Sequence, residues 1–302
     1  MDAERRAAAA SAPGPRWSGA FPPAVDVGPI KIGGGMPLAL LAGPCAIESE
    51  THALKTAEIL VRMTADAKLA FVYKSSYDKA NRSALRSYRG PGLHEGLRIL
   101  RRVRETFGCP VLSDVHLPSE VPAAAEALDL LQVPAFLCRQ TDLVVACGRS
   151  GRPVNVKKGQ FMAPWDMGNV VDKLSQSGCD RILLTERGAS FGYNNLVVDF
   201  RSLEIMRGLA VPVVFDATHS VQLPGAEGTR SGGERRYVTG LARAAAAFGV
   251  DALFMEVHED PARAPSDGPT MLPLDWLPGL LAELGAITRA LGALAPTAAA
   301  PP

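Results

Sequence analysis

Eight short apolar segments recur along the chain, each bounded by Gly, Pro, Asp or Ser and separated from the next by an amphipathic stretch of helical periodicity. Nearly continuous apolar strands that alternate with helices are typical of a parallel sheet covered on both faces. Eight such units fit a closed barrel better than an open sheet, so we predict a single (β/α)8 TIM barrel, of the α/β class, over residues 23–291. The segments span residues 38–47, 70–76, 110–116, 128–134, 153–159, 181–188, 212–220 and 251–259.

Polar or charged residues stand at or near the end of every one of these segments. They are Cys45, Lys74, Asp114, His116, Gln132, Lys157, Arg187, His219 and Glu256. In a barrel the carboxyl ends of all eight strands meet at one face, where active sites are found. A purely structural barrel has no reason to place polar groups at the same end of every strand. The pattern therefore favours an enzyme over a non-catalytic phosphate- or metal-binding barrel.

The charge and cysteine content of the chain limit its possible cellular compartments and binding partners. The 32 basic and 31 acidic residues leave a net charge of +1, so no overall field would attract nucleic acid or an anionic membrane. The five cysteines are odd in number, and neither a signal peptide nor an apolar run of about 18 residues is evident. We therefore expect a cytoplasmic protein with free thiols. Segments 1–22 and 292–302, rich in Ala and Pro, are predicted to be disordered tails.

A polar loop with five cations follows the second apolar segment. Residues 74–92 read KSSYDKANRSALRSYRGPG. Arg offers a planar fork to phosphate oxygens, Lys a compact charge, and Ser hydroxyls complete such a cradle. On its own, such a loop slightly favours a solvated basic surface. Its position at a strand end, with further cations at Lys157, Lys158 and Arg187, instead predicts a polyanionic substrate.

Four possible metal ligands come from distant parts of the chain. Cys45, His219 and Glu256 stand at strand ends, and Asp267 follows the eighth strand. A thiolate, an imidazole and two carboxylates suit zinc, iron(II) or manganese. The alternative is that Cys45 is a small buried hydrophobe and His219 a general acid or substrate contact. His258, two residues after Glu256, could support it through a hydrogen bond.

Together these motifs resemble the 3-deoxy-D-manno-octulosonate 8-phosphate synthases, also called 2-dehydro-3-deoxyphosphooctonate aldolases. The resemblance covers roughly residues 36–290, and KANRS (79–83) is its sharpest motif. The family's other motifs follow in order as SDVH, QVPAFLCRQTDL, NVKKGQF, ERGASFGYNNLVVD, FDATHSVQ and SDGP. The resemblance implies a transferase that condenses phosphoenolpyruvate, D-arabinose 5-phosphate and water to 3-deoxy-D-manno-octulosonate 8-phosphate and phosphate. That reaction belongs to lipopolysaccharide biosynthesis.

The resemblance also implies a role for each matching residue. Phosphoenolpyruvate would be held by Lys79, Lys157 and Arg187, with Lys74, Gln160 and the backbone of Ala135 nearby. The pentose phosphate would be held by Asn81, Arg82 and Ser83. The sugar aldehyde and hydroxyls would lie near Asp114, His116, His219 and Gln222. Gln132 would stand at the same strand ends, and Asp267 would help His219 to move protons. Cys45, His219, Glu256 and Asp267 match the metal-dependent branch, which would bind Zn, Fe(II), Mn or Co.

The resemblance also implies an oligomeric state, and two alternative functions remain. In this family Arg139 reaches the sugar phosphate across a subunit boundary, so a homotetramer is implied. One rival is a phosphoenolpyruvate-aldose synthase with another acceptor, such as erythrose 4-phosphate or N-acetylmannosamine. The KANRS motif argues against erythrose 4-phosphate, because the related aromatic-pathway synthase has KPRTS in that place. The other rival is the non-catalytic phosphate- or metal-binding barrel.

Overall fold

A computed structural model describes residues 21–226 and 231–293 of the chain. Eight parallel strands form a closed sheet in it, because the seventh strand pairs with the sixth on one side and with the eighth on the other, and the eighth pairs with the first. The barrel strands are β3 (Ala39–Gly43), β4 (Ala70–Lys74), β5 (Val111–Asp114), β6 (Leu130–Val133), β7 (Val154–Lys157), β8 (Ile182–Glu186), β11 (Val213–Asp216) and β14 (Ala252–His258). Each lies within one of the eight predicted segments, so the predicted TIM barrel is confirmed.

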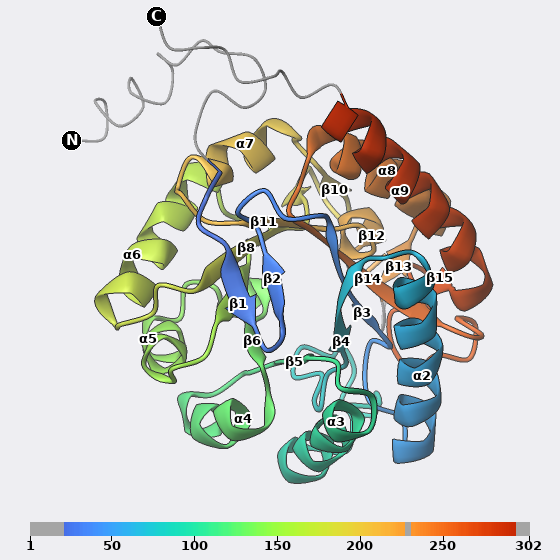
Figure 1. Cartoon of the computed structure of the whole chain (residues 1–302). Coiled ribbons are helices and arrows are strands. Elements are labelled where there is room, and N and C mark those ends of the chain that lie inside the picture. The colour runs from blue at the N-terminus through green and yellow to red at the C-terminus, as the bar shows by residue number, and fades with distance from the viewer. Residues whose placement is uncertain (1–20, 227–230, 294–302) are drawn as a thin grey trace, which may run out of the picture.

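A ring of helices surrounds the barrel (Figure 1). Its members are α2 (Glu50–Asp66), α3 (Leu93–Phe107), α4 (Val121–Ala127), α5 (Thr141–Arg149), α6 (Gly168–Gln176), α7 (Arg201–Arg207), α8 (Val238–Phe248) and α9 (Leu277–Ala293). The short strands are β1 (Val25–Val27), β2 (Ile30–Ile32), β9 (Ala189–Ser190), β10 (Leu196–Val197), β12 (Gln222–Leu223), β13 (Gly232–Gly233) and β15 (Leu272–Pro273). Among the described helices, none combines the length and apolarity needed to cross a bilayer.

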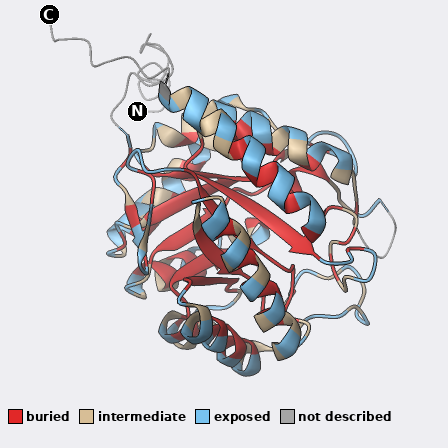
Figure 2. Cartoon of the chain, turned by 45° about the vertical axis from the view of Figure 1, so that its right-hand side comes forward, coloured by how far each residue is buried: buried red, intermediate tan, exposed pale blue. Residues whose placement is uncertain are grey.

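Local sequence explains where the helices start and stop and which side they bury. The hydroxyl of Ser49 caps α2 by accepting a hydrogen bond from the His52 N–H at 3.1 Å. Helix α3 ends at Gly108, whose φ of 67° is the left-handed conformation typical of a helix stop. Leu97, Leu100 and the other apolar residues of α3 face the strands, and Figure 2 shows the same division into buried and exposed faces around the barrel.

The antiparallel hairpin of β1 and β2 closes the amino-terminal end of the barrel. Val25, Val27 and Ile32 are buried against the apolar side chains that fill the barrel interior, among them Leu41 and Phe254. Figure 1 shows the hairpin lying across this opening. The hairpin was not predicted, although residues 23–32 were placed inside the folded domain. Because the hairpin covers this end, a substrate-binding site can form only at the carboxyl ends of the strands.

Truncating the hairpin should destabilise the whole barrel. We expect Ile32→Ala to lower the free energy of unfolding by roughly 2–5 kcal/mol, because Ile32 is fully buried and its removal leaves a cavity. Lys31→Ala, at the exposed neighbouring position, should change it by no more than about 0.5 kcal/mol. Urea unfolding monitored by circular dichroism measures both values. Equal effects would show that the hairpin does not contribute to the core.

The predicted tails lie mostly outside the described residues. Of the amino-terminal tail, the structure describes residues 21 and 22, and the Pro22 carbonyl accepts a hydrogen bond from the Gly34 N–H at 3.1 Å. At the other end, α9 continues through Ala293, two residues beyond the predicted end of the domain. The remaining tail residues, 1–20 and 294–302, are outside the described part of the chain.

Candidate active site

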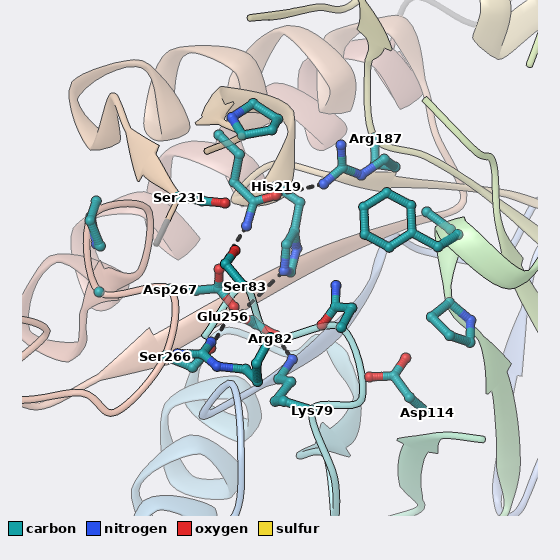
Figure 3. A pocket seen from close by; sticks show the side chains of 18 of the residues that line it. Lys79, Arg82, Ser83, Asp114, Arg187, His219, Ser231, Glu256, Ser266 and Asp267 are labelled. Carbon is teal, nitrogen blue, oxygen red and sulfur yellow. Dashed lines mark hydrogen bonds and ion pairs between the residues drawn. The ribbon is translucent and has the colours of Figure 1, made fainter. Parts of the chain in front are cut away.

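A cavity of about 630 Å³ opens at the carboxyl end of the barrel strands. Most of the predicted site residues line it: Lys74, Lys79, Asn81, Arg82, Ser83, Asp114, His116, Ala135, Lys157, Gln160, Arg187, His219, Gln222, Glu256 and Asp267. Figure 3 shows several of them, among them Lys79, Asp114, Arg187 and Glu256, around this one space. The strand-end pattern of the sequence therefore corresponds to a single pocket.

Cys45 is held in place by an unusually close approach of two strands. At Gly43, the last residue of β3, an added Cβ would lie 2.0 Å from the Lys74 carbonyl oxygen, so only glycine fits. The chain then turns through Pro44 into Cys45, which is 1% exposed. The Lys74 ammonium donates a hydrogen bond to the Cys45 carbonyl at 3.1 Å. The thiol is thereby fixed beside the ends of β4 and β14.

Three of the four candidate metal ligands come together at the wall of this cavity, and the fourth, His219, lies beside Glu256. The Cys45 thiol donates to Asp267 Oδ2 at 2.9 Å, and the ligand atoms of Cys45, Glu256 and Asp267 all lie within 4.8 Å of one another. His219 Nε2 lies 3.5 Å from Glu256 Oε2. Asp267 reaches the group from a loop in which its own φ is +53°, an unfavourable value for a residue other than glycine.

His219 is oriented for ligation by a buried carboxylate. Its Nδ1 lies 2.7 Å from Asp216 Oδ2, and because a carboxylate only accepts, Nδ1 donates this hydrogen bond and leaves Nε2, 3.5 Å from Glu256 Oε2, as the ring nitrogen that could bind a cation. Burial alone would raise the pKa of the Asp216 carboxyl, but His219 and Lys157 outweigh burial and hold that pKa below its usual range. Asp216 was not predicted from the sequence, although its position three residues before His219 at a strand end was a usable signal.

These four residues fit a divalent cation. The Glu256 Oε2 atom is buried and has no hydrogen-bond partner among the described residues, whereas Oε1 accepts from Lys74 at 2.6 Å. Burial raises the pKa of the Cys45 thiol, so the sulfur keeps its proton until a cation replaces it. Burial also opposes ionisation of Glu256, but Lys74 and Lys79 hold its pKa well below the usual range. A thiol, an oriented imidazole and two carboxylates are a suitable donor set for zinc or iron(II).

The cations of the cavity are buried and only partly neutralised. The Lys157 ammonium lies 2.6 Å from Asp216 Oδ2 and 3.6 Å from the centre of the Phe254 ring, and burial lowers its pKa. Arg187 donates through Nη2 to Gln222 Oε1 at 2.7 Å, whereas its buried Nη1 has no hydrogen-bond partner in the described chain. A free buried donor on a guanidinium is suited to an oxygen of a carboxylate or phosphate.

Asp114 anchors a ladder of buried polar side chains around the barrel interior. Its carboxylate accepts from Ser76 and from Gln132, both at 2.7 Å, and Gln132 accepts from Asn155 at 2.8 Å. Burial opposes ionisation of Asp114, but Lys74 and Lys79 lead the charges that hold its pKa below the usual range. Gln132 is fully buried below the cavity, so it orients Asp114 and does not itself line the pocket.

The basic loop between β4 and α3 reaches across the cavity mouth to the loop after β14. Arg82 Nη1 donates to Ser266 Oγ at 2.5 Å and Nη2 to the Pro265 carbonyl at 3.3 Å (Figure 3). The Nε atom of Arg82 is buried without a hydrogen-bond partner in the described residues. Arg82 therefore joins the two loops and keeps a donor for a further acceptor.

Some residues line the cavity without having been predicted, and some predicted site residues lie outside it. Two residues that were not predicted, Ser231 and Arg235 from the segment before α8, also line the cavity, and the basic run RSGGERR that contains them was a usable signal. Arg139 is exposed outside this chain's own cavity. The prediction that His258 supports Glu256 was wrong, because its Nε2 pairs with Glu48 at 2.9 Å and its Nδ1 accepts from the Asp260 N–H.

Comparison with known proteins agrees with this geometry. The model of the DAHP synthetase I family matches residues 16–291. A 2-dehydro-3-deoxyphosphooctonate aldolase of Citrifermentans bemidjiense is 61% identical over 263 residues, covering 87% of this chain and 96% of the relative. Proteins of the same name from Geobacter sulfurreducens and Syntrophotalea carbinolica are 60% and 59% identical, covering 87% and 88% of this chain and 97% and 96% of theirs. The predicted resemblance is thus confirmed, and the chain belongs to the DAHP synthetase I family.

Proposed function

We propose that this enzyme condenses phosphoenolpyruvate with D-arabinose 5-phosphate and water to give 3-deoxy-D-manno-octulosonate 8-phosphate and inorganic phosphate. The observation that carries the proposal is the set of relatives at about 60% identity over most of the chain, which are named 2-dehydro-3-deoxyphosphooctonate aldolase. The cavity supports it, because buried cations and hydroxyls around a thiol, imidazole and carboxylate group suit two phosphorylated substrates. The product serves lipopolysaccharide biosynthesis.

Phosphoenolpyruvate is assigned to the inner half of the cavity. Lys79, Lys157 and Arg187 hold its carboxylate and phosphate, with Lys74, Gln160 and the Ala135 backbone beside them. The unpaired Nη1 of Arg187 and the unpaired Oε1 of Gln160 support this assignment, since each is a buried polar atom that bound substrate or water can satisfy. The two substrates together carry about five negative charges, so their approach requires such buried cations.

The pentose phosphate is assigned to the mouth. Asn81, Arg82 and Ser83 lie on the loop that covers the cavity, and they hold the phosphate while Asp114 and His116 face the sugar. Asp114 stays ionised and accepts hydrogen bonds, so it can orient sugar hydroxyls. Gln222, which bonds both Arg187 and Asp267, lies between the two substrate regions.

The reaction needs one new carbon–carbon bond and no covalent enzyme intermediate. The C3 atom of phosphoenolpyruvate attacks the aldehyde carbon, water adds at C2, and the resulting hemiketal phosphate loses phosphate by cleavage of its C–O bond. In the absence of a bound cation, His219 and Asp267 are assigned to move protons to the aldehyde oxygen and from water. When bound by Cys45, His219, Glu256 and Asp267, a divalent cation supplies Lewis-acid stabilisation of negative charge on oxygen.

Phosphate release tests the proposed reaction. The purified chain with phosphoenolpyruvate should release phosphate rapidly with arabinose 5-phosphate and slowly or not at all with erythrose 4-phosphate or N-acetylmannosamine. A preference for another aldose would reassign the acceptor. No release with any aldose, from a folded and metal-loaded chain, would favour the non-catalytic barrel.

We further propose that the enzyme works as a homotetramer in which Arg139 completes a neighbour's site. Arg139 is exposed, and large exposed apolar side chains surround the same side of the barrel at Phe136, Phe161 and Phe191. They come from the loops that follow β6, β7 and β8, which are neighbours in the sheet. Such a patch supports a subunit contact there. The cytoplasmic location stays a prediction.

Mixed assemblies test the contribution of Arg139. Arg139→Ala and Arg82→Ala chains should each be nearly inactive at arabinose 5-phosphate concentrations well below their KM. Hybrids of the two should regain activity, because a site with intact Arg82 can then receive Arg139 from its neighbour. Steady-state rates before and after dissociation and reassembly measure the gain. Hybrids verified by mass that remain as inactive as their parents would mean that each site is built within one chain.

A further inference from the structure

A second cluster of possible ligands lies beside the active site but outside its cavity. Glu48 follows Cys45 by three residues and precedes α2, His52 lies in the first turn of α2, and His258 ends β14. One ligand atom from each lies within 4.8 Å of the others. None of these three described residues lines the cavity. The cluster is therefore separate from the group of Cys45, Glu256 and Asp267.

The imidazole of His52 is oriented as a ligand. Its Nε2 lies 2.9 Å from Glu259 Oε2, and because a carboxylate accepts, Nε2 carries the proton. The lone pair of the neutral ring is then on Nδ1, which is buried, has no hydrogen-bond partner among the described residues, and lies 4.0 Å from Glu48 Oε1. A carboxylate that fixes the tautomer of a histidine is the usual support for a metal ligand.

Glu48 and His258 supply the other donors. His258 Nε2 lies 2.9 Å from Glu48 Oε1, and the His258 side chain is 5% exposed. In this structure Nδ1 of His258 accepts from the Asp260 N–H at 2.9 Å, so binding a cation at Nε2 requires the ring to release that hydrogen bond, after which Nδ1 carries the proton and faces Glu259 Oε2, 3.7 Å away. Ligand atoms about 2.0–2.2 Å from zinc stand about 3.4 Å apart, so small side-chain rotations bring the three donors to that spacing.

The charge of the cluster also favours a cation. Two carboxylates, Glu48 and Glu259, face two imidazoles, those of His52 and His258. A hydrogen-bond network alone would account for the Glu–His pairs, but it leaves Nδ1 of His52 without a partner. A buried ring nitrogen with a free lone pair, facing a carboxylate and a second imidazole, is an acceptor without a donor, and a cation satisfies it.

From these contacts we propose that Glu48, His52 and His258 form a second divalent-cation site that takes zinc or a similar transition metal through nitrogen and oxygen donors alone. The site joins the segment after Cys45 to the end of β14, which carries Glu256. It has three protein donors, so water completes the coordination. The proposal concerns binding and is independent of the proposed reaction.

Cobalt(II) distinguishes this site from the thiolate site, because only the site with Cys45 gives a sulfur-to-cobalt charge-transfer band. Titration of the metal-free full chain should show two bound equivalents, only one of which carries that band. We expect His52→Ala to lose the equivalent without the band, with at least about a hundredfold weaker binding, and to keep the other. His94→Ala, at an exposed helical histidine outside the cluster, should bind like the wild type.

Zinc binding to the Cys45→Ala chain gives an independent test. That chain should retain one zinc equivalent by calorimetry and elemental analysis, and the added zinc should raise its melting temperature. Adding His52→Ala or Glu48→Gln should remove both effects. Zinc binding by Cys45→Ala that is unchanged by His52→Ala, or a wild type that binds a single equivalent with the thiolate band, overturns the second site. A wild type whose single equivalent lacks the band and is lost in His52→Ala would support it and count against the Cys45 metal site instead.

Discussion

Replacing Arg82 by alanine should raise the KM for arabinose 5-phosphate by roughly 30- to 1000-fold, because losing a two-pronged phosphate contact costs about 2–4 kcal/mol. The KM for phosphoenolpyruvate should change far less, since Arg82 lies at the cavity mouth and the inner cations Lys157 and Arg187 remain. Initial rates with each substrate varied in turn measure both constants. Equal increases for the two substrates would contradict the assignment of this loop to the sugar phosphate.

Two control variants separate phosphate binding from loop structure. Arg86→Ala removes an exposed cation from the same loop, outside the cavity lining, and should leave both KM values nearly unchanged. Ser266→Ala removes the partner that Arg82 bonds across the mouth but keeps the guanidinium. If Ser266→Ala reproduced the effect of Arg82→Ala, the arginine would act by joining the two loops and not by binding phosphate.

Replacing Cys45 by alanine should abolish both the thiolate-bound metal and turnover. Loss of groups that merely support a ligand weakens metal binding by roughly 10- to 100-fold, so loss of the sulfur itself should weaken it by at least about 100-fold. In the wild type, a strong chelator should stop turnover, and Zn²⁺, Mn²⁺, Fe²⁺ or Co²⁺ should restore it to different extents. Elemental analysis and phosphate release measure the two effects. A metal-free wild type that remained fully active would make Cys45 a packed thiol only.

The Cys45→Asn variant separates loss of the metal from loss of a polar partner. An asparagine amide at this position can still donate a hydrogen bond to Asp267, as the thiol does. We therefore expect Cys45→Asn to bind little metal at this site yet keep measurable turnover that resists chelation. Cys45→Ala leaves Asp267 without that donor and should keep neither. Equal inactivity of the two variants would mean that the metal is indispensable in this chain.

The barrel and its active face were predictable from the sequence for a local reason. A strand buried on both faces is a short apolar run, and the residue that leaves the barrel at its end is polar, so Lys74, Lys157 and Glu256 were recognisable one segment at a time. The hairpin at 25–32 was not, because two three-residue strands carry too little pattern. Its apolar side is recognisable only when the barrel interior that it covers is present.

Contacts between distant segments were decided by the tertiary structure alone. The link of Arg82 to Ser266 depends on two loops 184 residues apart in the chain. Glu48 and His258 are 210 residues apart and meet because β3 pairs with β14 when the barrel closes. The sequence shows which donor residues the chain contains. The pairing of the first and last barrel strands determines which of these donors share a site, because spacing along the chain carries no information about contacts that form when the barrel closes.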